Sequence, residues 1–139
     1  MHLSDEQRGQ IRKIAERRRV KMALLFGSAV TGKREHAGSD LDIAVMYEDE
    51  PADYREHGEL ARDFQKLFPN HEVDLASLHH ADPLFLKKVT EECQLLHGDH
   101  HRLQELKIFA YKRFQDHRRY FDMERAYVDR FLKTMTPAK

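Results

Sequence analysis

The stretch Leu24-Leu25-Phe26-Gly27-Ser28 is followed, across a polar segment, by Ser39-Asp40-Leu41-Asp42-Ile43-Ala44-Val45. An apolar run thus ends in Gly-Ser, and the next apolar run opens with two carboxylates one residue apart. Because side chains alternate along a β-strand, Asp40 and Asp42 are predicted to face one side while the apolar residues face a core. The sequence therefore predicts a strand with one buried face and one face that presents two acids.

Two carboxylates held this close repel each other and are costly to keep ionised without a cation. Magnesium prefers carboxylate and phosphate oxygens, so Asp40 and Asp42 are candidate Mg²⁺ ligands. Gly27 lets the backbone approach a ligand closely, and Ser28 adds a hydroxyl where the chain is expected to turn into a helix, whose free N–H groups favour anions. The stretch therefore indicates a site for a divalent metal ion and for the phosphates of a nucleotide.

A third candidate acid lies in His71-Glu72-Val73-Asp74-Leu75-Ala76-Ser77-Leu78. The alternation of this segment predicts another half-buried strand with acids on its polar face. If Asp74 lies beside Asp40 and Asp42, it can share the metal and accept the proton of an attacking hydroxyl. Glu72 has the same parity, so both acids stay open and Asp74 is preferred.

Hydrophobic periodicity along the chain predicts an α+β fold in which helices pack on a mixed β-sheet. Ser4 is expected to cap a first helix that runs to about Arg19, and a stripe of apolar residues marks a long C-terminal helical tail. The expected strands are 20–26, 42–47, 73–78 and a short edge strand at 94–97, and the expected helices are 4–19, 54–68, 84–92 and 99–134.

The chain has 139 residues, of which 40% are hydrophobic, and this suits one domain with one core. We expect a single domain over residues 1–139, with a core at about 20–97 and a helical extension at about 99–134. No apolar stretch is long enough to span a bilayer and the start of the chain is strongly polar, so a cytoplasmic protein is expected. Cys93 is the one cysteine, so no internal disulfide forms.

The formal net charge of zero conceals an uneven distribution. Residues 101–139 carry ten Lys and Arg against five Asp and Glu, so this segment is net positive and the rest of the chain is equally net negative. A basic segment can bind an acidic protein, phosphates or RNA, or it can be a solvated helix face, and these alternatives stay open. The acidic remainder argues against general nucleic-acid binding.

Together, Gly27-Ser28, Asp40-Leu41-Asp42 and the later Asp74 resemble the signature of the minimal nucleotidyltransferase (MNT) family of the DNA polymerase β-like superfamily. That signature is Gly-Ser, a spacer and Asp-x-Asp. The resemblance covers residues 22 to 96 and implies a small nucleotidyltransferase fold. It also implies that the three acids bind Mg²⁺ and are catalytic, and that the Gly-Ser turn binds the nucleotide.

The short length and the basic helical tail are most similar to MntA-type antitoxins of this family. The resemblance implies a HEPN-domain ribonuclease toxin as partner, and transfer of AMP from ATP to a tyrosine hydroxyl of that toxin as activity. Two alternatives stay open: neutralisation by binding alone, and transfer to a small molecule such as an aminoglycoside or to RNA. The chain shows no added domain to enclose a small acceptor, which favours a protein acceptor, and no membrane or direct nucleic-acid partner is expected.

Charged and histidine pairs outside the signature are further candidates. Lys33 and Arg34, in the spacer between its two halves, would help to hold a triphosphate. His79-His80 and His100-His101 resemble zinc ligands, but neighbouring side chains on a strand point apart and no cysteine set completes a site. We therefore interpret both histidine pairs as solvated loop residues.

Overall fold

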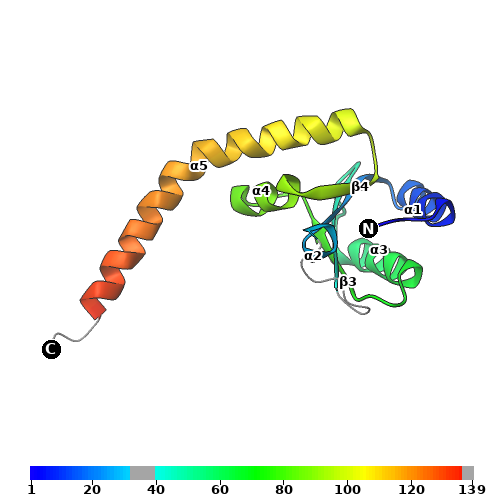
Figure 1. The fold of residues 1–139 in the computed structure, drawn as a ribbon, viewed down its shortest axis with the longest axis horizontal. Coiled ribbons are helices and arrows are strands. Elements are labelled where there is room, and N and C mark those ends of the chain that lie inside the picture. Colours follow the sequence, from blue (N-terminus) through cyan, green and yellow to red (C-terminus); the bar gives the residue numbers. More distant parts are fainter. Residues whose placement is uncertain (32–39, 136–139) are drawn as a thin grey trace.

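The computed structural model describes residues 1–31 and 40–135 (Figure 1). Every helix and strand predicted from periodicity is present, with ends that differ from the prediction by at most two residues. The elements follow the chain in the order α1 (Asp5–Arg17), β1 (Val20–Phe26), α2 (Ser28–Thr31), β2 (Leu41–Tyr47), α3 (Tyr54–Leu67), β3 (Val73–Ser77), α4 (Pro83–Glu91), β4 (Cys93–His97) and α5 (His100–Met135).

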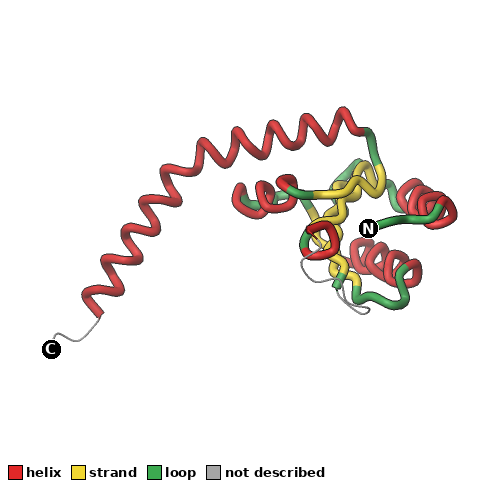
Figure 2. The backbone as a smooth tube through the Cα atoms, in the orientation of Figure 1, coloured by secondary structure: helices red, strands yellow, loops and turns green. Residues whose placement is uncertain are grey.

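The four strands form one sheet in the order β3-β2-β1-β4. β1 pairs antiparallel with both β2 and β4, whereas β2 pairs parallel with β3 through the crossover that contains α3. The sheet is therefore mixed and β4 lies at its edge, which confirms the predicted α+β class. In Figure 2 the strands gather in one part of the molecule, and the C-terminal half of α5 extends away from them.

Helices cover both faces of the sheet. α1 and α3 cover one face, and the core there includes Ile11, Ile43 and Phe64, all fully buried. α4 and the first turns of α5 cover the other face, where Ala44 and Leu24 are fully buried. The prediction that only one face of β2 is buried is therefore wrong, because the face that carries Asp42 continues into a second core.

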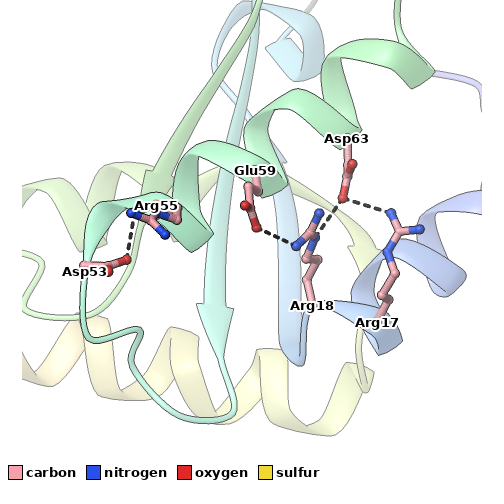
Figure 3. A network of polar contacts seen from close by, with 6 residues as sticks. All are labelled: Arg17, Arg18, Asp53, Arg55, Glu59 and Asp63. Atoms are coloured by element: carbon pink, nitrogen blue, oxygen red, sulfur yellow. Dashed lines mark hydrogen bonds and ion pairs between the residues drawn. The ribbon is translucent and has the colours of Figure 1, made fainter.

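A group of arginine side chains fixes α1 against α3 (Figure 3). Arg18 donates from Nε to Asp63 Oδ2 at 2.9 Å and from Nη1 to Glu59 Oε2 at 2.8 Å. Arg17 Nη2 donates to the same Asp63 oxygen at 3.0 Å. At the other end of α1, Ser4 forms the expected cap, since its Oγ accepts from the Gln7 amide at 3.1 Å. These contacts hold together the layer of α1 and α3 that covers one face of the sheet.

The apolar stripe of α5 packs only in part. Leu103, Leu106 and Ala110 are buried against the sheet and α4, and beyond them the helix leaves the body of the molecule (Figure 1). The large apolar side chains exposed farther along are Tyr111, Tyr120, Met123, Tyr127, Val128, Phe131, Leu132 and Met135. Over residues 1–31 and 40–135, no helix combines the length and apolar character that a membrane crossing requires.

Candidate functional site

The predicted acids lie at the end of the sheet where β1 finishes and β2 and β3 begin. In the parallel pair of β2 and β3, Asp42 is the register partner of Asp74. Register partners on neighbouring strands point to the same face, so these two carboxylates are neighbours on the side that α4 covers. Asp40 precedes β2, is exposed, and adds a third negative charge that acts on Asp42.

The strand register distinguishes between Glu72 and Asp74, the two candidates for the third acid that the alternation of the sequence could not separate. Asp74 lies directly opposite Asp42, whereas Glu72 precedes β3 and has no partner in this register; both acids are exposed. The contribution of Glu72 at this end is a backbone one, because its carbonyl accepts from the Leu41 amide at 2.8 Å and fastens the start of β3 to β2. The geometry therefore favours Asp74 over Glu72 as the third acid.

Gly27 lies directly against the Asp42 side chain. Its φ of 80° lies in the left-handed region, which residues other than glycine adopt only at a cost in conformational free energy. A Cβ at this position would be 3.3 Å from Asp42 Cγ and 3.5 Å from Asp42 Cβ, and it would overlap Asp42 Oδ2. The close approach of a ligand to Gly27 stays a prediction, and the group that lies against this glycine in the structure is the Asp42 carboxylate.

The β1–α2 turn has the predicted form. Ser28 begins α2, and the amides of Val30 and Thr31 both donate to the Gly27 carbonyl at 3.1 Å. The Ser28 side chain is partly buried beside this turn. Lys33 and Arg34, the other candidates for holding a triphosphate, lie outside the described residues.

Crowding of acids governs the electrostatics of the site. Burial raises the pKa of the Asp42 carboxyl, and the charges of Asp74 and Asp40 raise it further, whereas Lys88 opposes them. A divalent cation would relieve this repulsion, and carboxylate oxygens are the donors that Mg²⁺ prefers. In the described part of the chain, no group of three or more His, Cys, Asp and Glu side chains is arranged to hold a metal ion. The three acids thus interact through their charges without forming a closed set of ligands.

Lys88 is a residue of this region that sequence reasoning missed. A cavity of about 310 Å³ is lined by Gly27 and Thr31 from the β1–α2 turn and by Lys88, Glu91 and Glu92 from α4 and its end. In the sequence, Lys88 is one of two adjacent lysines on an amphipathic helix. Its position three residues after an apolar aromatic, Phe85, was the signal available.

The histidine pairs do not all behave as predicted. His79 is half-buried and its Nε2 accepts from the Tyr47 amide at 3.0 Å, so a solvated role is wrong for this residue. His80 is exposed and pairs with Glu50 at 2.9 Å. His100 and His101 begin α5 rather than occupying a loop. His79 and His80 follow β3 and lie near the last residue of β2, whereas Asp42 is at the other end of that strand. None of the four histidines belongs to the acid cluster.

Known proteins share this architecture. The chain matches the family described as Polymerase beta, Nucleotidyltransferase over residues 9–102. No curated protein matches it significantly in sequence. Among solved structures, a chain of a toxin-antitoxin crystal structure with AMP-PNP has a TM-score of 0.71 at 22% identity, with 90% of this chain and 98% of that chain covered.

Two further solved structures extend the comparison. A chain of the complex between a tri-AMPylated Shewanella oneidensis HEPN toxin and an MNT antitoxin has a TM-score of 0.68 at 20% identity, with 94% of this chain and 99% of that chain covered. Spectinomycin adenyltransferase AAD(9) from Enterococcus faecialis, solved with ATP and spectinomycin, has a TM-score of 0.53 at 15% identity, with 75% of this chain and 59% of that chain covered. At these identities the similarities show a common fold.

Proposed function

The chain belongs to the polymerase beta nucleotidyltransferase family, and from this premise we propose that it is an antitoxin that transfers AMP from ATP to a tyrosine hydroxyl of a cognate HEPN ribonuclease toxin. The observation that carries the transfer activity is the register pairing of Asp42 with Asp74 beside Gly27 on this fold. The proposed unit of activity is one domain over residues 1–139, acting in the cytoplasm.

The donor set fits a magnesium ion in chemistry and charge. Asp40, Asp42 and Asp74 would hold the ion, with phosphate oxygens of the nucleotide and water as its other ligands. This fits the open arrangement of the three acids, because Mg²⁺ in nucleotide sites commonly uses one or two carboxylates together with the substrate. When bound, the ion supplies neutralisation of charge on the reacting phosphates and on the leaving pyrophosphate.

Residues of the chain would bind the phosphates, orient the reacting phosphorus and accept the proton of the acceptor hydroxyl. The turn at Gly27 and Ser28 would hold the outer phosphates and so orient the α-phosphorus. The acceptor oxygen attacks this phosphorus in line while Asp74 accepts the proton of the hydroxyl. A new bond forms between the acceptor oxygen and phosphorus, and the bond to the bridging oxygen breaks. Pyrophosphate leaves with that electron pair, and AMP remains on the acceptor.

The surface of α5 supports a protein acceptor supplied by a partner. The exposed apolar side chains between residues 111 and 135 lie on a helix that projects from the body, and clusters of this kind mark protein interfaces. Residues 101–139 are also net basic, which suits an acidic partner surface. Structures of similar fold come from complexes of an MNT antitoxin with a HEPN toxin, and this is the partner class we propose.

A second candidate function is neutralisation of the toxin by binding alone. The observation that favours it is the set of exposed apolar side chains on α5, which offers an interface whether or not the acids act. Transfer to a small molecule receives less support, because the match to spectinomycin adenyltransferase spans 59% of that protein.

Isotope transfer tests the proposed reaction and its rivals. The chain would be incubated with Mg²⁺, the cognate HEPN protein and ATP labelled at either the α- or the γ-phosphate. We expect label on the HEPN protein from α-labelled ATP and none from γ-labelled ATP, because AMP is the transferred group. Label from the γ-position would indicate phosphoryl transfer instead. Absence of label from both, with a stable complex, would favour neutralisation by binding.

A further inference from the structure

Packing of α4 on the sheet directs one of its lysines toward the acid cluster. Phe85 contacts Phe26, the last residue of β1, edge to face, with ring centroids 5.9 Å apart and planes at 84°. Phe26 is the register partner of Asp42, so this contact places α4 next to the acids. Lys88 follows Phe85 by three residues and therefore lies on the same side of the helix, one turn farther on.

Lys88 lines the cavity that opens beside Gly27. The cavity has a volume of about 310 Å³, which lies at the lower end of the range for small-molecule sites. Because Asp42 lies against Gly27, the cavity adjoins the acid cluster at this turn. Among its described lining residues, Lys88 is the cation, while Glu91 and Glu92 carry negative charge. Lys88 offsets part of the negative charge of these two glutamates, so it is the charged group of this described lining that attracts an anion.

The adjacent lysine differs in both partner and direction. Lys87 forms an ion pair with Glu91, and its Nζ lies 4.8 Å from the ring centroid of Phe114 on α5. Within residues 1–31 and 40–135, Lys88 has no hydrogen bond or ion pair at contact distance. It instead lines the cavity beside Gly27. The two lysines thus form a natural pair of test and control.

We propose that Lys88 binds the triphosphate of ATP, with its ammonium group donating to phosphate oxygens in the cavity beside Gly27. The inference rests on the proposed nucleotidyl transfer and adds a phosphate-binding residue outside the Gly-Ser and Asp-x-Asp signature. Lysine is suited to this task as a compact charge with three rotatable donors. A metal ion held by the acids would then bind the triphosphate from one side, and Lys88 on α4 would bind it from the other.

The test measures ATP binding by calorimetry in the presence of Mg²⁺ on the full chain. We expect Lys88→Gln to weaken ATP binding by about tenfold to hundredfold, the range for loss of a hydrogen bond to a charged group. Lys88→Arg should retain most of the affinity because it keeps the charge. The matched control Lys87→Gln should bind ATP within about twofold of the wild type, because its ammonium faces Phe114.

Each outcome bears on the inference. Wild-type affinity in Lys88→Gln, with wild-type thermal unfolding to show that α4 is intact, would overturn the role of Lys88 and leave the proposed function standing. Equal losses in Lys87→Gln and Lys88→Gln would also overturn it, because they would point to the overall charge of α4. A wild-type chain that does not bind ATP would overturn the proposed function and this inference with it.

Discussion

The carboxylate of Asp42 occupies the space that a Cβ on Gly27 would fill. This relationship joins the two halves of the motif, since the glycine that follows β1 makes room for the acid at the second position of β2. The Gly-Ser turn and the Asp-x-Asp strand are therefore one structural unit, and a change in either half should affect the other.

Gly27→Ala should be destabilising and inactivating. The substitution forces a side chain into the left-handed region, at a cost of about 1–2 kcal/mol, and drives its Cβ into Asp42. Urea unfolding and ATP binding would measure the two effects. Gly58→Ala is the matched control, because Gly58 lies within α3 with nothing within 4 Å of its added Cβ. That control should gain up to about 1 kcal/mol of stability from helix propensity. Wild-type stability and binding in Gly27→Ala would contradict the close packing.

Asp74→Asn should lower the rate of transfer by about 10²–10⁴-fold, the range for loss of a positioned general base. The fold should persist, because removing one of several crowded negative charges relieves repulsion on Asp42. Steady-state transfer rates would measure the effect. Glu72→Gln is the control, since Glu72 lies on the same segment but outside the register pair. A larger loss in Glu72→Gln than in Asp74→Asn would reverse the assignment of the third acid.

Asp63→Asn should destabilise the fold in a pH-dependent way. Burial alone would raise the pKa of Asp63, but hydrogen bonds and charges from Arg18 and Arg17 outweigh burial and lower it. A pKa lower in the folded than in the unfolded state gives a contribution that is complete above the unfolded value of about 4 and is lost as pH falls through the folded value. We expect a loss of about 1 kcal/mol at pH 7, shrinking in acid.

Urea unfolding at several pH values would measure this dependence. The control is Asp49→Asn, because the side chains of Asp49 and its partner Arg19 are 82% and 69% exposed and should contribute little. A difference between wild type and Asp63→Asn that stays constant from neutral to acidic pH would show that the ion pairs in Figure 3 do not carry the effect.

Phe131→Ser together with Val128→Ser should weaken association with the partner without lowering the stability of the chain. Both side chains are about half exposed and lie one turn apart on the projecting half of α5. Hot spots in interfaces typically cost 2 kcal/mol or more on truncation, so we expect a loss of affinity of roughly thirtyfold. Binding to the HEPN protein would be measured by surface plasmon resonance, with Lys133→Arg, which keeps the charge, on the same helix as control. Unchanged affinity would place the interface elsewhere.

Much of the fold could be predicted because local pattern and tertiary packing agree. The alternation around Leu41 and Ile43 matches their burial against α1 and α3, and the Ser4 cap marks the start of α1 correctly. The burial of Ala44 on the second face was missed, since a small residue between Ile43 and Val45 does not show which helices cover it.

The candidate site could be predicted in its residue types more than in its arrangement. Parity left Glu72 and Asp74 equivalent, and the register between β2 and β3 separates them. The spacing of Lys88 from Phe85 was a signal in the sequence, but it does not show that Phe85 packs on Phe26, and this contact is what places Lys88 near the acids. The same holds for His79, whose hydrogen bond to the Tyr47 amide follows from the turn after β3.

The most direct test is intact mass spectrometry of the cognate HEPN protein after incubation with this chain, Mg²⁺ and ATP. The control is the Asp40→Asn/Asp42→Asn double variant, which should fold and still bind its partner. We expect a mass increase in whole AMP units with the wild type and none with the double variant. An unmodified HEPN protein in a stable, neutralised complex with the wild-type chain would contradict the proposed transfer of AMP.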